Sequence, residues 1–294
     1  MGSFESFDSL RKTQTHHALS AWHREPHAHS DNEFRELRLR NKTAEHSTSD
    51  ALVYVRQDFD ATKPINIVVY NHGFGSTAGG ALSKSEIRSM MANARPNTIF
   101  VAPEWQSHPG TRNGDSGSFS QDNKFSHMLD EILQKTPALH GTTLRDVTRI
   151  DIIAHSAGYA PTESEIYKNP GISGKVRSIT LLDSLYEKHA FDRWLTDNID
   201  DLSAGRKQFF NISNHSTLKN SQEQASLVAS LLRHRRLSPH NYVADYGTTP
   251  RPVERHRAEM ASRSIVFAAT TTEHLAIPSA YIGPTLAALK SDRA

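Results

Sequence analysis

The segment Ile152-Ile153-Ala154-His155-Ser156-Ala157-Gly158 decides how the chain is interpreted. It ends a hydrophobic run that begins at Val147, and small residues stand two positions before and two positions after the serine. A serine in a sharp turn between a strand and a helix presents its hydroxyl above the end of the strand, and only small flanking residues fit so tight a turn. The segment therefore predicts a strand, a turn that carries Ser156, and a helix after it.

The sequence on both sides of this segment alternates between strand-like and helix-like patterns. Strands are predicted at residues 34–40, 51–55, 65–70, 98–101, 147–154, 176–182, 208–212 and 265–269, and helices at 81–94, 125–133 and around 227–232. Strands that alternate with helices form a mostly parallel sheet with helices on both faces. The first two strands are separated only by a polar loop, so we expect an antiparallel N-terminal edge. The predicted class is α/β.

Three parts of the chain are distinguished. Residues 33–294 contain no internal repeat and no linker, and we expect one domain there. Residues 1–32 form a polar arm with five histidines, His16, His17, His23, His27 and His29. A solvated arm is favoured over a metal-binding tract, because only His23 and His27 have the i, i+4 spacing of a helical site. Residues 236–263, with weak periodicity, form either a cap or lid above the sheet or a surface excursion.

Composition excludes several classes of protein. The chain has 294 residues, a formal net charge of +2 and no cysteine, so it has no thiolate nucleophile and no cysteine-ligated metal. Nearly balanced charge argues against a nucleic-acid binder, and no apolar run is long enough to be a transmembrane segment. With no Walker loop and no G-x-G-x-x-G after a strand, we expect no cofactor and no metal. No secretory signal is visible, so a cytoplasmic location is expected.

Two further side chains belong with Ser156. Asp183 follows the predicted strand 176–182, and His274 lies in the loop after 265–269. Carboxyl ends of parallel strands meet at the edge of a sheet where ligands bind. In this constellation His274 takes the proton of Ser156, and Asp183 fixes the tautomer of the imidazole and stabilises its charged form.

The order Ser156, Asp183, His274 resembles that of the α/β-hydrolase fold, and the resemblance covers residues from about 50 to 294. The A-H-S-A-G turn, in which Ala154 replaces the usual glycine, is similar to that of some bacterial lipases. The resemblance implies a serine hydrolase. It also implies an oxyanion loop at His72-Gly73-Phe74-Gly75, with backbone N–H groups near Phe74 and at Ala157 as donors.

The position of the acid departs from the commonest pattern of this superfamily. Most members carry it after the next strand, where this chain has Asn214 and no carboxylate before Glu223. Some lipases and dehalogenases carry it one strand earlier, which corresponds to Asp183. We therefore prefer Asp183 to the other carboxylates, including Asp245. An amide at Asn214 could orient His274 but could not balance its charge.

Residues around this constellation are weaker candidates. Substrate contacts are expected for Gly75, Glu104, Trp105 and His215, with loop packing as the alternative for Glu104 and Trp105. His155 is expected to pack in the turn rather than to take part in catalysis.

The predicted function is hydrolysis of a carboxylic ester through an acyl-enzyme. The sequence leaves two alternatives open. The same three side chains could cleave an amide or peptide, because both reactions use one nucleophile and one oxyanion hole. Alternatively, the chain is an inert hydrolase-like scaffold that binds a partner. In the first two cases the expected partner is a small-molecule ester or amide.

Overall fold

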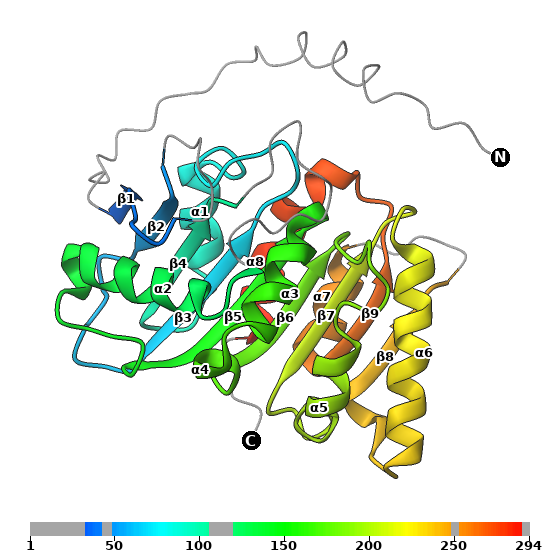
Figure 1. Ribbon diagram of the computed structural model, residues 1–294. Coiled ribbons are helices and arrows are strands. Elements are labelled where there is room, and N and C mark those ends of the chain that lie inside the picture. Colours follow the sequence, from blue (N-terminus) through cyan, green and yellow to red (C-terminus); the bar gives the residue numbers. More distant parts are fainter. Residues whose placement is uncertain (1–32, 43–48, 106–119, 248–252, 290–294) are drawn as a thin grey trace, which may run out of the picture. The chain divides into compact units, whose positions relative to one another are not determined.

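A computed structural model describes residues 33–42, 49–105, 120–247 and 253–289 (Figure 1). The arm predicted at residues 1–32 lies outside the described residues. The strands are β1 (Phe34–Leu37), β2 (Ala51–Val55), β3 (Ile65–Asn71), β4 (Thr98–Pro103), β5 (Val147–His155), β6 (Val176–Leu182), β7 (Gln208–Ser213), β8 (Tyr242–Asp245) and β9 (Ile265–Ala269). The helices are α1 (Lys84–Met91), α2 (Lys124–Lys135), α3 (Tyr159–Tyr167), α4 (Pro170–Ser173), α5 (Asp192–Ser203), α6 (Leu218–His234), α7 (Val253–Ser262) and α8 (Ile277–Leu289).

The described strands form a single nine-stranded sheet in the order β1-β2-β4-β3-β5-β6-β7-β9-β8. β2 runs antiparallel to both β1 and β4, and every other neighbouring pair is parallel. The predicted mostly parallel sheet with an antiparallel N-terminal edge is therefore confirmed.

Both faces of the sheet are buried, which explains why the strand sequences are almost continuously apolar. Successive side chains of β3 point to opposite faces. Ile67 and Val69 belong to the core cluster that also contains residues of α2, α3, α5 and α6. Val68 and Tyr70 belong to the second cluster, with residues of α1, α7 and α8. Figure 1 shows the first group of helices in front of the sheet and the second group behind it.

Two helices show the local sequence signals that predict them. α1 begins after a capping box, in which the Ser83 side chain accepts a hydrogen bond from the Glu86 N–H and Glu86 accepts one from the Ser83 N–H. α2 buries Phe125, Leu129 and Ile132 among others, at the spacing of one helical face.

The register of the central strands brings the candidate segments together. Asn71, at the end of β3, pairs with Ala154 of β5, and His155, at the end of β5, pairs with Leu182 of β6. The loop after β3, the turn at Ser156 and Asp183 therefore leave the sheet side by side. The chain order reverses direction between β3 and β5, which is the place where open α/β sheets bind their ligands.

The described part of residues 236–263, for which a cap or lid and a surface excursion are both open from the sequence, forms regular elements. It contributes β8, which extends the sheet parallel to β9, and α7, which packs against α8. The short, partly exposed sequence of β8 is typical of an edge strand. No helix in the described ranges has both the length and the apolar character to cross a membrane.

Candidate active site

The turn after β5 holds Ser156 in an unusual backbone conformation. Ser156 has φ 53° and begins a short 3₁₀ turn, Ser156–Gly158, that leads directly into α3. A non-glycine residue in this region costs about 1–3 kcal/mol, and surrounding structure must enforce it. Gly158 is part of that enforcement. A Cβ added there would lie 2.3 Å from the backbone oxygen of Asn71, so only glycine allows the turn to pack against β3.

The loop after β3 lies against this turn. A Cβ added at Gly73 would lie 3.1 Å from Cβ of Ser156 and 3.2 Å from Nδ1 of His155, so glycine permits the close approach. Phe74 follows with its side chain 44% exposed, and Gly75 has φ +75°. No described residue accepts a hydrogen bond from the Phe74 N–H. The geometry leaves that group available for a ligand.

Glu104 and Trp105 pack against this loop and hydrogen-bond to its backbone. The indole Nε1 of Trp105 donates to the His72 carbonyl oxygen over 3.1 Å, and the two rings stack with centroids 5.4 Å apart. Oε2 of Glu104 accepts from the Ala78 N–H over 2.7 Å. Trp105 is 1% and Glu104 5% exposed. These contacts favour the loop-packing interpretation of both side chains, and a contact with substrate stays a prediction.

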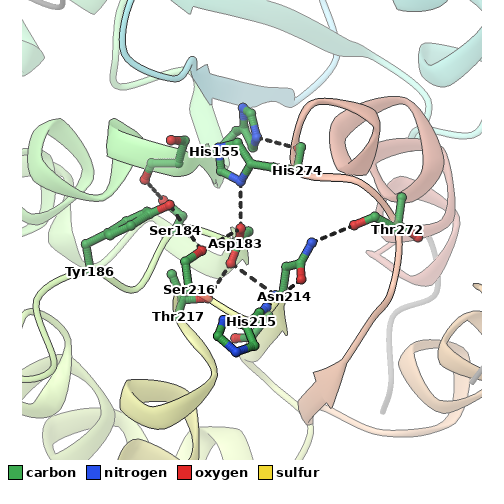
Figure 2. A network of polar contacts seen from close by, with 12 residues as sticks. His155, Asp183, Ser184, Tyr186, Asn214, His215, Ser216, Thr217, Thr272 and His274 are labelled. Carbon is green, nitrogen blue, oxygen red and sulfur yellow. Dashed lines mark hydrogen bonds and ion pairs between the residues drawn. The ribbon is translucent and has the colours of Figure 1, made fainter. Parts of the chain in front are cut away.

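His274 and Asp183 form a direct pair. Nδ1 of His274 lies 2.6 Å from Oδ2 of Asp183, and Figure 2 shows the carboxylate at the centre of a set of donors. Asp183 has φ 47°, directly after the last residue of β6. Its side chain is fully buried, while that of His274 remains 33% exposed. Because an ionised carboxylate only accepts, Nδ1 of His274 carries the proton, which leaves Nε2 free to accept one.

Several donors keep the Asp183 carboxylate charged. Burial alone would raise the pKa of Asp183, but hydrogen bonds outweigh it and the pKa is lowered from its ordinary value. Besides His274, the donors are the Thr217 hydroxyl at 2.5 Å and the Asn214 N–H at 3.0 Å to Oδ1, and the Ser216 hydroxyl at 3.3 Å to Oδ2. All three lie in the segment that follows β7.

Asn214 stands where most α/β-hydrolases carry the acid, and it serves the loop of His274 rather than its ring. Its Nδ2 donates to the Thr272 carbonyl oxygen over 2.9 Å. The neighbouring His215 is exposed, and its backbone N–H donates to the Asn214 side chain. The structure thus brings Asn214 into the polar network of Figure 2, whereas the predicted substrate contact of His215 stays a prediction.

Ser156 is held near the pair by its neighbours. The Ser184 hydroxyl donates to the Ser156 carbonyl oxygen over 2.6 Å, and the ring of His155 lies 4.7 Å from that of His274. Both residues are described, and the Ser156 hydroxyl makes no hydrogen bond to the His274 ring. Such bonds are often long in unliganded sites and shorten only when substrate binds.

Tyr186 was not identified from the sequence. It follows Asp183 by three residues, and its hydroxyl lies 3.4 Å from the Ser216 hydroxyl. Burial raises the pKa of the Tyr186 phenol, while hydrogen bonding to the Ser216 and Ser156 hydroxyls acts in the opposite direction. Its ring lies 6.2 Å from that of Tyr159, at the start of α3. The pair forms an aromatic flank beside the turn.

Three hollows in the described structure lie apart from the candidate catalytic side chains. Hollows of about 340, 400 and 460 Å³ are found there, and none of these three is lined by Ser156, Asp183 or His274. Within the described ranges no group of three or more His, Asp or Glu side chains could hold a metal ion.

The chain resembles solved hydrolase structures at low sequence identity. A mutant of the feruloyl esterase module from Clostridium thermocellum, complexed with sinapinate, is 14% identical with a TM-score of 0.53, over 88% of this chain and 89% of that one. A structure described as FAE is 16% identical with a TM-score of 0.52, over 81% and 82% of the two chains. An esterase of Pyrococcus furiosus is 11% identical with a TM-score of 0.46, over 88% and 93%.

No protein-family model and no curated protein matches the chain. The evidence for its class is therefore structural. The strand order, the antiparallel edge and the position of Ser156 between β5 and α3 are those of the α/β-hydrolase fold. The solved structures at TM-scores of 0.53 and 0.52 share this fold. The chain has the α/β-hydrolase fold.

Proposed function

We propose that the chain is a serine hydrolase that cleaves a carboxylic ester through Ser156, His274 and Asp183. The observation that supports this most is the 2.6 Å contact between Nδ1 of His274 and Oδ2 of Asp183, next to a serine at φ 53°. A buried carboxylate that orients an imidazole beside a strained serine turn has a direct use in acyl transfer.

In the first half of the reaction, Oγ of Ser156 attacks the ester carbonyl carbon, and its proton passes to Nε2 of His274. The carbonyl oxygen becomes negatively charged and accepts hydrogen bonds from the N–H groups of Phe74 and Ala157. Such donors are typically worth about 3 kcal/mol each in the transition state. When the intermediate collapses, the leaving alcohol takes the proton from His274 and an acyl-serine remains.

In the second half, water attacks the acyl-serine and gives a proton to Nε2 of His274. The oxyanion forms again at the same donors, and Ser156 recovers its proton as the carboxylic acid leaves. Asp183 remains ionised throughout, since its hydrogen bonds lower its pKa. It stabilises the imidazolium that forms in each half of the reaction.

Exposed apolar side chains support a substrate with an apolar portion. Phe74, in the loop after β3, is 44% exposed, and Leu275, next to His274, is 72% exposed. Both therefore border the site. Exposed apolar groups that gather at one place often mark a binding surface. An ester whose acyl or alcohol group is apolar would cover them.

A fluorophosphonate probe tests the proposal, because it reacts preferentially with an activated serine. We expect the wild type to be labelled at Ser156 and Ser156→Ala to remain unlabelled. Ser173→Ala, at an exposed serine of α4, is the matched control and should be labelled like the wild type. A folded wild type that is not labelled would favour the inert scaffold.

The leaving group is then determined with a substrate panel. p-Nitrophenyl esters of increasing chain length are compared with aminoacyl anilides, and the proposal expects turnover of esters and little of anilides. Methyl ferulate and methyl sinapinate belong in the panel, because one solved structure with this fold is a feruloyl esterase module with sinapinate bound. Preferential cleavage of anilides would instead identify an amidase or peptidase.

A further inference from the structure

We propose that His155 is a positioning residue for His274: its Nε2–H group holds the backbone of the base, while Asp183 holds the imidazole ring. The inference rests on the proposed function, in which His274 is the general base. From the sequence alone, His155 is expected to pack in the turn.

The contact that carries the proposal joins two loops. Nε2 of His155 lies 3.0 Å from the carbonyl oxygen of His274, across 119 residues of sequence. A carbonyl oxygen only accepts hydrogen bonds, so Nε2 of His155 is the donor and carries the proton. The two rings also touch, with centroids 4.7 Å apart at 36° (Figure 2).

The base depends on this contact because its own loop is exposed. The residues next to His274, Glu273 and Leu275, are both exposed, and Leu275 is 72% so. The loop begins at the Thr272 carbonyl held by Asn214 and continues into the 3₁₀ turn His274–Ala276. Within this turn the Ile277 N–H also donates to the carbonyl oxygen of His274. The bond from His155 is the contact that joins this carbonyl group to the end of β5, next to Ser156.

The position of His155 couples the base to the nucleophile. His155 precedes Ser156 directly and is the last residue of β5, so its backbone is fixed by the sheet. Its ring is 6% exposed and is confined on the Nδ1 side by Gly73, whose added Cβ would lie 3.2 Å away. One rigid side chain therefore sets the distance between the turn of Ser156 and the loop of His274.

The imidazole ring of His155 makes this contact in its neutral form. Burial, followed by the nearby His274, lowers the pKa of His155 to about 4, so the ring is neutral at neutral pH. His72 lowers the pKa as well, while Asp183 and the contact with the His274 carbonyl raise it. A neutral ring can lie against His274 without opposing the imidazolium that forms there during the reaction.

Variants of equal length separate the hydrogen bond from the volume of the side chain. His155→Gln keeps an N–H donor, and His155→Met has a similar length without one. His155→Phe keeps a ring without a donor and serves where the methionine variant does not fold. Leu202→Ala, at a fully buried residue of α5 in the main core, is a control for loss of stability alone.

Each protein is treated with a fluorophosphonate, and the final extent and the second-order rate constant of labelling are measured separately. A variant that is irreversibly unfolded in part is labelled to a lower final extent, because those molecules do not react. Loss of positioning lowers the rate constant while labelling still goes to completion. The kcat and KM for a p-nitrophenyl ester and the pH profile of the labelling rate complete the comparison.

We expect His155→Met and His155→Phe to label fully but at least tenfold more slowly than the wild type, with kcat lowered and KM unchanged. His155→Gln should come within about threefold of the wild type, and Leu202→Ala should keep the wild-type rate constant. The acidic limb of the pH profile should persist in every variant, because the base is His274.

Two results would overturn the inference while the proposed function stands: wild-type rate constants in the methionine and phenylalanine variants, or a glutamine variant as slow as they are. Disappearance of the acidic limb in the His155 variants would identify His155 as the base. That result would also overturn the inference that His155 only positions His274. A folded wild type that does not label at all removes the proposed function, and this inference with it.

Discussion

Asp183 and His274 are hydrogen-bonded over 2.6 Å although they follow strands that are not neighbours, since β7 lies between β6 and β9. The residues after β7 close this gap. Asn214 donates its backbone N–H to Asp183 and its side-chain amide to the carbonyl oxygen of Thr272, two residues before the base. The proposed acid, Asp183, follows the strand before the usual one, and the amide of Asn214 thus joins it to the loop of His274.

Replacement of Asp183 by Asn should cripple turnover. The amide removes the charge that stabilises the imidazolium and no longer selects the tautomer of His274, so we expect kcat to fall by about 10³–10⁴-fold. KM for a p-nitrophenyl ester should change little, because Asp183 is buried and does not face the substrate. Steady-state kinetics of the purified variant provide the measurement.

Asp245→Asn is the control for this assignment. Asp245 ends the edge strand β8 and lies 3.5 Å from Arg255, so its loss should leave kcat within about twofold of the wild type. If Asp245→Asn were inactive and Asp183→Asn fully active, the acid would have been assigned to the wrong strand.

Gly158→Ala should distort the turn of Ser156. The new methyl group would lie 2.3 Å from the Asn71 backbone oxygen, and a backbone atom of β3 cannot move away cheaply. We expect a destabilisation of about 1–3 kcal/mol, typical of overpacking in a core, together with a large loss of labelling by fluorophosphonate.

Gly171→Ala is its counterpart, since no atom lies within 4 Å of the added Cβ. Gly171 lies in α4, where alanine is the better helix former, so stability should stay equal or rise by up to about 1 kcal/mol. Urea unfolding of both variants makes the comparison. Equal stability for the two would mean that the turn does not need glycine at 158.

The sequence predicted the parts of the molecule whose physics is local. The apolar runs of β3, β5, β6 and β9 end within a residue of their predicted limits, because both faces of the sheet are covered. The place of Asp183 after a strand favours it among the carboxylates, and the structure brings its Oδ2 within hydrogen-bond distance of His274. The amphipathic face of α2 was equally readable.

Other parts depend on contacts that the sequence does not display. α8 was not predicted, because it is apolar on nearly every side and contains Pro284, so it has no helical periodicity to detect. The direction of Trp105 is decided by the carbonyl oxygen of His72, and that of His155 by the carbonyl oxygen of His274. Both acceptors lie far away along the chain.

The apolar border of the site should show in the preference for chain length. Leu275→Ser and Phe74→Ser remove exposed apolar surface beside the site, and we expect KM for long-chain p-nitrophenyl esters to rise severalfold. KM for the acetyl ester should stay nearly constant, because a short acyl group reaches neither side chain. A uniform change across the series would place these residues outside the binding surface.

Acid stability should depend on His155. Its pKa is lowered to about 4 in the folded protein, whereas an unfolded histidine titrates near 6.5. Between these values the unfolded chain binds a proton that the folded chain does not, so the free energy of unfolding falls as pH falls. About 3 kcal/mol of stability should be lost between pH 7 and pH 4 through this group. His155→Gln lacks the titration, so the stability of the wild type relative to this variant should decrease by that amount over the same range. Urea unfolding of both proteins at pH 7, 5.5 and 4 measures it, and parallel curves would show that burial does not hold the ring neutral.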